Sequence, residues 1–171
     1  MQSNGPLKLG KLFLFEGGIR VPMVFKFPGT FGPNTEYDEP TSTLDLFPTI
    51  CGVAGIKLPP KINFDGVDLT PFINGKVSGI PHDTLFWSNG PNIAVRHGNW
   101  KLVKSYDNTW LFHLASDIEE SKNLVESEPE IVEQLETLYH KWRSHMVEPA
   151  WPSKPNRRKV EVDGLQYEMN I

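Results

Sequence analysis

Two adjacent glycines near the start of the chain constrain its fold most. Gly17 and Gly18 stand in the segment Glu16-Gly17-Gly18-Ile19-Arg20-Val21-Pro22. Because glycine has no Cβ, such a pair lets one backbone segment approach another backbone or a ligand closely, and it also permits positive φ. Pro22 favours an extended conformation in the residue before it. We therefore predict a tight turn that leads into an extended segment.

Charged side chains surround this predicted turn. Lys11 precedes Glu16 by five positions, and Glu16 and Arg20 place opposite charges on either side of the glycines. A lysine held rigidly ahead of such a turn is a compact point charge that suits an oxyanion. On the residues alone, a solvated loop lysine is the simpler interpretation. We interpret Glu16 and Arg20 as a pair that fixes the geometry of the turn and does not touch substrate.

The first 80 residues resemble part of a larger domain. Residues 23–27 are apolar on both faces apart from Lys26, a pattern typical of a strand buried inside a larger sheet. Few strand candidates follow before residue 83, so we expect the partner strands to lie outside this chain. A short apolar helix is predicted over residues 45–54, with Pro48 in its first turn and Gly55 at its end. One further helical turn is predicted at residues 69–73.

A different pattern begins at residue 83. Short segments rich in aromatic and β-branched residues alternate with turn residues, and they predict an antiparallel meander with strands at residues 84–88, 93–97, 100–105 and 109–114. A helix is predicted over residues 128–146, with Ser127 and Glu130 placed for a capping box. Its apolar stripe should pack on the meander: Ile131, Leu135, Leu138, Trp142 and Met146. The residues from 149 onward are polar and proline-rich, and they predict a tail or an edge-packing extension.

Composition excludes several classes of protein and site. A net charge of −4 over 171 residues offers no basic footprint for nucleic acid. No apolar run approaches the roughly 18 residues that span a bilayer, and the N-terminus has no signal-peptide pattern. Cys51 is the single cysteine and lies in an apolar helix, so we expect a buried structural thiol. None of the five histidines has the spacing of a metal-binding pair.

Read together, the motifs of this chain resemble the C-terminal part of the sulfatase family, which carries a lysine, four residues and then Glu-Gly-Gly-x-Arg-x-Pro. The resemblance runs from about residue 4 to residue 146. The further motifs follow in family order: residues 42–49, 64–71, 83–87, 94–102 and 111–114, then Asp117, Glu120, Asn123 and Leu124.

The resemblance implies an α/β fold of the alkaline-phosphatase-like superfamily, which is α+β in this stretch. Residues 1–80 would be a remnant of the mixed-sheet catalytic domain. Residues 81–148 would form a small four-stranded antiparallel subdomain packed by a helix, and residues 149–171 a tail or extension.

The resemblance also implies an activity, the hydrolysis of sulfate esters. In the family a formylglycine, made from Cys or Ser in Cys/Ser-x-Pro-x-Arg, attacks sulfur beside a calcium ion, and Lys11 would contact the sulfate. We expect the nucleophile and the calcium carboxylates to precede Met1, so this chain alone should bind no metal and turn over no substrate. Asn4 resembles half of the Asp-Asn pair that binds calcium, but no Asp precedes it. We therefore expect no metal ligand in this chain.

The implied partners are a sulfated small molecule or sulfated carbohydrate and the N-terminal part of the catalytic domain. Relatives of this kind are periplasmic, secreted or lysosomal. Two alternatives stay open on the sequence: a non-catalytic carbohydrate-binding or structural module, and part of a related phosphoester or phosphonate hydrolase. The Lys-x4-Glu-Gly-Gly-x-Arg motif favours the sulfatase over the second.

Overall fold

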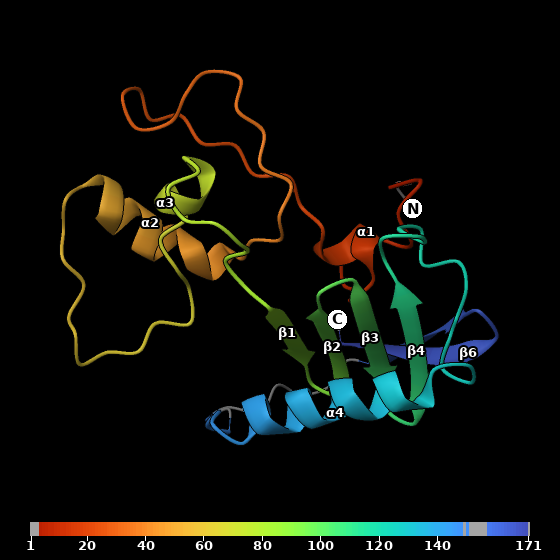
Figure 1. Cartoon of the computed structure of the whole chain (residues 1–171). Coiled ribbons are helices and arrows are strands. Elements are labelled where there is room, and N and C mark those ends of the chain that lie inside the picture. The colour runs from red at the N-terminus through yellow and green to blue at the C-terminus, as the bar shows by residue number, and fades with distance from the viewer. Residues whose placement is uncertain (1–3, 149, 151–156, 171) are drawn as a thin grey trace. The chain divides into compact units, whose positions relative to one another are not determined.

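The computed structural model of the chain describes residues 4–148, 150 and 157–170. These residues form two compact units, shown in Figure 1. The first unit joins the N-terminal residues up to Val21 with the chain from Thr84 onward, and the second holds residues 22–83. Residues 4–21 thus pack with the meander in this structure, although they are continuous in sequence with the second unit.

The first unit is built on the predicted antiparallel meander. Its four strands follow one another in the order β1-β2-β3-β4, and each is antiparallel to the next. Their bounds agree with the predicted ones to within one residue at each end: β1 (Thr84–Asn89), β2 (Asn92–His97), β3 (Trp100–Ser105) and β4 (Asn108–His113). Short turns with Gly90 and Gly98 at positive φ join the first three strands.

One face of this sheet is covered by α4 (Pro129–Arg143), which lies across the strands in Figure 1. The helix places Leu135 and Tyr139 against sheet residues that include Leu102, and Ile131, Leu138 and Trp142 pack around them. The predicted capping box is wrong. The helix begins after Glu128, which makes no side-chain cap bond, and Ser127 Oγ donates to Leu124 O instead. Pro129 explains the shift, because its fixed φ suits the first helical position and it has no N–H to cap.

The opposite face is covered by a β-hairpin of β5 (Arg157–Val162) and β6 (Leu165–Asn170). It lies in the stretch that sequence analysis read as a polar tail or extension; residues 149 and 151–156 lie outside the described chain. Apolar residues alternate with polar ones along both strands, and Val162, Tyr167 and Met169 are buried. Ser105 Oγ accepts a hydrogen bond from the Glu168 N–H at 3.0 Å, which ties β6 to the meander.

The same core receives the N-terminal segment. Phe13, Leu14 and Phe15 are buried together with Trp110 and Tyr167. The Phe15 ring meets the Trp110 ring edge-on, with 5.6 Å between centroids. This apolar run explains why the start of the chain packs with the meander.

The second unit contains a short 3-10 helix (Thr43–Asp45), α2 (Leu46–Val53) and α3 (Thr70–Ile73), close to the predicted helices. Buried Asp45 organises it. Its carboxylate accepts hydrogen bonds from the N–H groups of Ser42 (2.7 Å) and Val67 (2.8 Å) and contacts His82 Nε2 at 2.8 Å. Three separate segments are thereby joined at one side chain.

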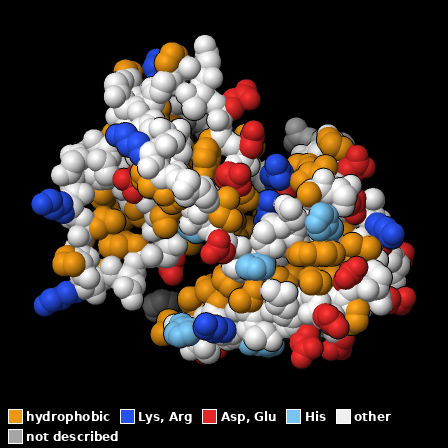
Figure 2. Space-filling view, viewed as in Figure 1, with side chains coloured by type: hydrophobic (Ala, Val, Ile, Leu, Met, Phe, Trp, Pro, Cys, Tyr) orange, Lys and Arg blue, Asp and Glu red, His pale blue; other side chains and the backbone are white. Residues whose placement is uncertain are grey.

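The strand predicted at residues 23–27 is absent from this structure. These residues form no regular element, and the Val24 side chain is 92% exposed. A strand needs a neighbour to satisfy its backbone groups, and the second unit offers none. On the same unit Leu44, Phe47 and Ile50 of the 3-10 helix and α2 are also exposed. Figure 2 shows hydrophobic side chains open on this part of the surface. No helix in the described chain is long and apolar enough to cross a membrane.

Candidate active-site loop

Lys11 lies at the corner of a turn. The Phe13 N–H donates to Gly10 O at 3.1 Å, so Lys11 and Leu12 are the central residues of the turn. Leu12 has a φ of 82°, a conformation that a leucine keeps only where its surroundings impose it. The Lys11 side chain is exposed and makes no ion pair within the described residues. The chain thus presents this ammonium group outward from a constrained turn.

The two glycines lie directly beneath this loop, in α1 (Glu16–Ile19). A Cβ on Gly17 would come within 2.4 Å of Lys8 O, and a Cβ on Gly18 within 2.0 Å of Phe13 O. Both distances are far below van der Waals contact. The Gly17 N–H also donates to Lys8 O at 3.0 Å. The glycines are required here for close backbone approach and not for positive φ.

Glu16 anchors this helical turn in the core of the first unit. Its Oε1 lies 2.8 Å from Lys101 Nζ, and its Oε2 lies 3.3 Å from Arg20 Nη1. Burial by itself raises the pKa of the Glu16 carboxyl, but the charges and hydrogen bonds of Lys101 and Arg20 outweigh it, so the pKa is lowered. Glu16 is therefore a charged, fixed residue facing away from solvent.

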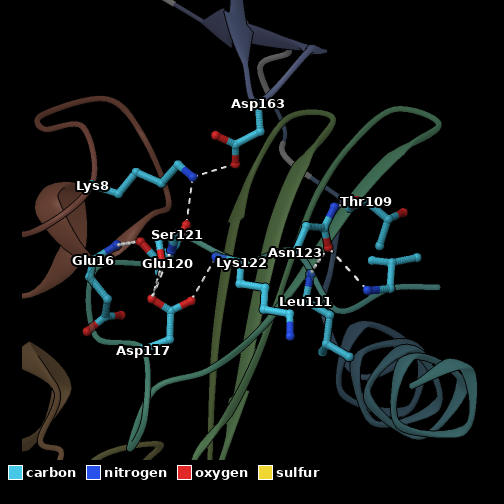
Figure 3. A network of polar contacts seen from close by, with 11 residues as sticks. Lys8, Glu16, Thr109, Leu111, Asp117, Glu120, Ser121, Lys122, Asn123 and Asp163 are labelled. Atoms are coloured by element: carbon cyan, nitrogen blue, oxygen red, sulfur yellow. Dashed lines mark hydrogen bonds and ion pairs between the residues drawn. The ribbon is translucent and has the colours of Figure 1, made fainter. Parts of the chain in front are cut away.

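A second buried carboxylate, Glu120, completes the cluster. Its Oε1 lies 2.8 Å from Lys101 Nζ. Its Oε2 accepts a hydrogen bond from the Glu16 backbone N–H at 2.7 Å, which Figure 3 shows. Burial raises the pKa of the Glu120 carboxyl; Lys101 acts against this, while the nearby charge of Glu16 adds to the rise. Two carboxylates therefore share one buried ammonium group.

The loop that carries Glu120 is itself held by local bonds. The Asp117 carboxylate accepts hydrogen bonds from the backbone N–H groups of Ser121 and Lys122, both at 2.9 Å. Burial by itself raises the pKa of the Asp117 carboxyl, but the hydrogen bonds from Ser121 and Lys122 together outweigh it, so the pKa is lowered. Asn123 Oδ1 accepts from the Leu111 N–H at 3.0 Å, which fastens the loop to β4 (Figure 3).

Lys8, at the start of the candidate loop, points inward. Its Nζ donates to Glu120 O at 2.6 Å, pairs with Asp163 in the β5–β6 turn, and lies 5.4 Å from the centroid of the Phe112 ring. The loop therefore carries two lysines with different tasks: Lys8 ties it to the core, and Lys11 faces outward.

All five residues singled out in the sequence, Lys11, Glu16, Gly17, Gly18 and Arg20, belong to this loop and turn. Sequence reasoning missed Lys8, Lys101 and Glu120 as partners. Lys101 carried a usable signal: strand alternation puts it on the same face as Val103, which faces the core, and a fully buried lysine requires a charged partner. Nothing local in the sequence shows which carboxylates supply it.

Other candidate residues make structural contacts. Asn4 Nδ2 donates to Gly17 O at 2.7 Å, Thr84 Oγ1 lies 2.8 Å from His97 Nδ1, and Cys51 is buried. No group of three or more His, Cys, Asp or Glu side chains suited to a metal ion occurs among the described residues.

One sequence pattern needs a correction. Ser153-Lys154-Pro155-Asn156-Arg157 fits Cys/Ser-x-Pro-x-Arg, a segment that we expected to precede Met1. Residues 151–156 lie outside the described part of the chain, and residue 157 begins β5. Whether Ser153 serves as a nucleophile is therefore tested by substituting this residue.

Residues 8–146 match the family profile described as N-sulphoglucosamine sulphohydrolase, C-terminal. The chain belongs to the sulfatase family. Bovine (Bos taurus) arylsulfatase A is 32% identical over 170 residues, covering 79% of this chain and 33% of the relative. Mouse (Mus musculus) steryl-sulfatase is 32% identical over 177 residues, covering 84% of this chain and 28% of the relative.

Two solved structures also align with this chain. The crystal structure of Ps i-CgsB aligns with a TM-score of 0.75 at 29% identity, covering 87% of this chain and 34% of that one. The same protein in complex with k-i-k-neocarrahexaose aligns with a TM-score of 0.74 at 30% identity, covering 87% of this chain and 34% of that one. The chain spans between 15% and 33% of the length of four curated sulfatases that it matches.

Proposed function

We propose that this chain serves as the C-terminal part of a sulfatase that hydrolyses sulfate esters, with Lys11 contacting the sulfate group. One observation carries the proposal. Lys11 is an exposed cation at the corner of a turn that leads directly into buried Phe13 and whose floor admits only glycine. A cation fixed in this way stabilises the negative charge that grows on the leaving oxygen and the sulfate oxygens during hydrolysis.

Calcium, which the family resemblance implies, does not fit the described residues, because these residues contain no group of three or more His, Cys, Asp or Glu side chains suited to a metal ion. We propose that another part of the protein holds the calcium ion and supplies the formylglycine. The proposed contribution of this chain is to bind and orient the sulfate through Lys11. A charge that matters more in the transition state than in the ground state acts chiefly on kcat.

The proposed substrate is a sulfated small molecule or a sulfated carbohydrate. The family profile named after a sulphoglucosamine hydrolase and the Ps i-CgsB complex with an oligosaccharide support the carbohydrate. The proposed location of the enzyme is outside the cytoplasm, in the periplasm, the medium or a lysosome.

We further propose that the exposed apolar surface of the second unit packs against the N-terminal part of the sulfatase. Val24, Phe47 and Ile50 are 92%, 55% and 52% exposed. Phe47 and Ile50 stand three positions apart in α2, a spacing that puts them on one face of the helix, and an exposed apolar face of this kind marks an interaction site. The curated relatives are three or more times longer than the stretch that this chain matches. Their remaining residues are therefore numerous enough to cover this apolar surface.

The test is Lys11→Ala in a sulfatase that carries this chain, with Lys26→Ala, another exposed lysine, as the matched control. We expect kcat on a sulfate ester to fall by about 10²- to 10³-fold in the first variant, as for other single oxyanion contacts, and to stay unchanged in the second. A Lys11→Ala enzyme with normal kcat would show that the lysine is not an anion contact.

A further inference from the structure

We propose that Glu120, acting with Lys101, is a positioning residue for Lys11. It holds the loop of residues 8–13 in place through the turn at Glu16. This inference rests on the proposed function, because it assumes that Lys11 contacts the sulfate.

Glu120 fixes the start of α1 at two points. Its Oε2 accepts the hydrogen bond of the Glu16 backbone N–H at 2.7 Å. Its Oε1 and the Glu16 carboxylate both bind Lys101 Nζ at 2.8 Å. One bond sets where the backbone of Glu16 lies and the other sets where its side chain lies. Moving the turn would therefore break a buried hydrogen bond to a carboxylate or a buried ion pair.

The turn at Glu16 in turn supports the loop of residues 8–13, which carries Lys11. The Gly17 N–H donates to Lys8 O, and Gly18 lies under both Gly10 O and Phe13 O, the two ends of the turn that presents Lys11. Glu120 also reaches this loop directly, because its backbone carbonyl accepts a hydrogen bond from Lys8 Nζ at 2.6 Å. The carboxylate and the carbonyl of one residue thus hold the loop from two sides.

The cluster has no exposed member at its centre. Lys101 and Glu120 are fully buried and Glu16 is 3% exposed, so water does not replace a lost bond. Lys11, by contrast, is exposed and needs support from the chain around it. A small displacement of a catalytic group lowers turnover steeply, by up to about 10²-fold for a shift near 1 Å.

The first test uses the chain itself. Glu120→Gln keeps the shape of the side chain, but its amide has only one acceptor oxygen for two donors, the Glu16 N–H and Lys101 Nζ. Glu119→Gln is the matched control, because Glu119 is the exposed neighbour with the same charge. We expect hydrogen exchange at the Gly17 and Phe13 amides to become about 10-fold faster or more in the first variant. Equal rates at these amides in both variants would overturn the proposal.

The second test uses a sulfatase that carries the chain. We expect Glu120→Gln to lower kcat about 10-fold or more with little change in KM. In a Lys11→Ala background Glu120→Gln should not lower kcat further, because Glu120 affects kcat only by positioning Lys11. A full, additive loss in that background contradicts a positioning role and indicates loss of stability alone.

The two tests separate this inference from the proposed function. If Lys11→Ala leaves kcat unchanged, the proposed function fails, while the exchange rates still decide whether Glu120 holds the loop. If tryptophan fluorescence shows that the Gln variant does not fold, Glu120→Asp replaces it in both experiments. Aspartate keeps the charge, but its side chain is shorter by one methylene. We therefore expect the same changes in hydrogen exchange and kcat, with smaller magnitudes.

Discussion

Glu16 and Glu120 lie 104 residues apart in the sequence, yet their carboxylates share the ammonium group of Lys101. Arg20 also pairs with Glu16, whereas Glu120 forms no ion pair with a second cation among the described residues. The pKa of the Glu16 carboxyl is accordingly lowered, and the pKa of the Glu120 carboxyl is raised. The pKa values of these two carboxyl groups, which contact the same lysine, are thus shifted in opposite directions.

This difference predicts opposite pH dependences for two variants. Because the pKa of Glu16 is lowered, its contribution to stability is present above the ordinary value of 4.5 and is lost as pH falls below it. Because the pKa of Glu120 is raised, its contribution is present below 4.5 and is lost as pH rises through the raised pKa. The stability advantage of the wild type over Glu16→Gln should therefore grow with pH, and that over Glu120→Gln should shrink.

The measurement is urea unfolding followed by tryptophan fluorescence over a pH series on both sides of 4.5. Residues 22–83, which form the second unit, contain no tryptophan, and Trp87, Trp100, Trp110 and Trp142 belong to the first unit, so the signal reports on the unit that contains the cluster. Glu119→Gln, at an exposed neighbour, should show neither trend. Parallel curves for Glu16→Gln and Glu120→Gln would contradict the opposite pKa directions.

The floor of the Lys11 loop gives a second prediction. Gly18→Ala places a methyl group 2.0 Å from Phe13 O, so either α1 or the turn above it must move. Overpacking of this kind costs roughly 1–3 kcal/mol of unfolding free energy. Gly10→Ala is the control in the same loop, because its new methyl group meets only the end of the Asn4 side chain at 3.1 Å. Urea unfolding should separate the two variants, and equal stability would mean that the close approach at Gly18 is unimportant.

The sequence predicted those features that depend on neighbours in the chain. The meander follows from strand-length apolar segments separated by turn residues, and α4 follows from its apolar stripe. The β5–β6 hairpin was missed because its alternation is short and lies among prolines and charges. The pairing of Lys101 with Glu16 and Glu120 was missed for another reason: the partners come from three separate segments, and only the packing of the sheet brings them together.

The exposed apolar surface of the second unit gives a third prediction. Phe47→Ser with Ile50→Ser should reduce self-association of the chain, measured by sedimentation, because both side chains lie more than half in solvent. In a sulfatase that carries the chain, the same pair should lower stability, because the surface is then covered. Val147→Ser, at an apolar residue that is 90% exposed on the first unit, is the control and should change neither property. Unchanged stability of the sulfatase would show that this surface is not the proposed interface.

The last prediction concerns Ser153, in the segment that fits Cys/Ser-x-Pro-x-Arg. A nucleophile must lie within a few Å of the sulfur that Lys11 contacts. The family resemblance leads us to expect the nucleophile ahead of the stretch that this chain matches, and not in its last residues. We expect Ser153→Ala to keep full turnover of a sulfate ester in a sulfatase that carries this chain, under conditions where Lys11→Ala loses it. Loss of turnover in Ser153→Ala, with the fold intact by tryptophan fluorescence, would place the nucleophile in this chain and would require a different arrangement of the site.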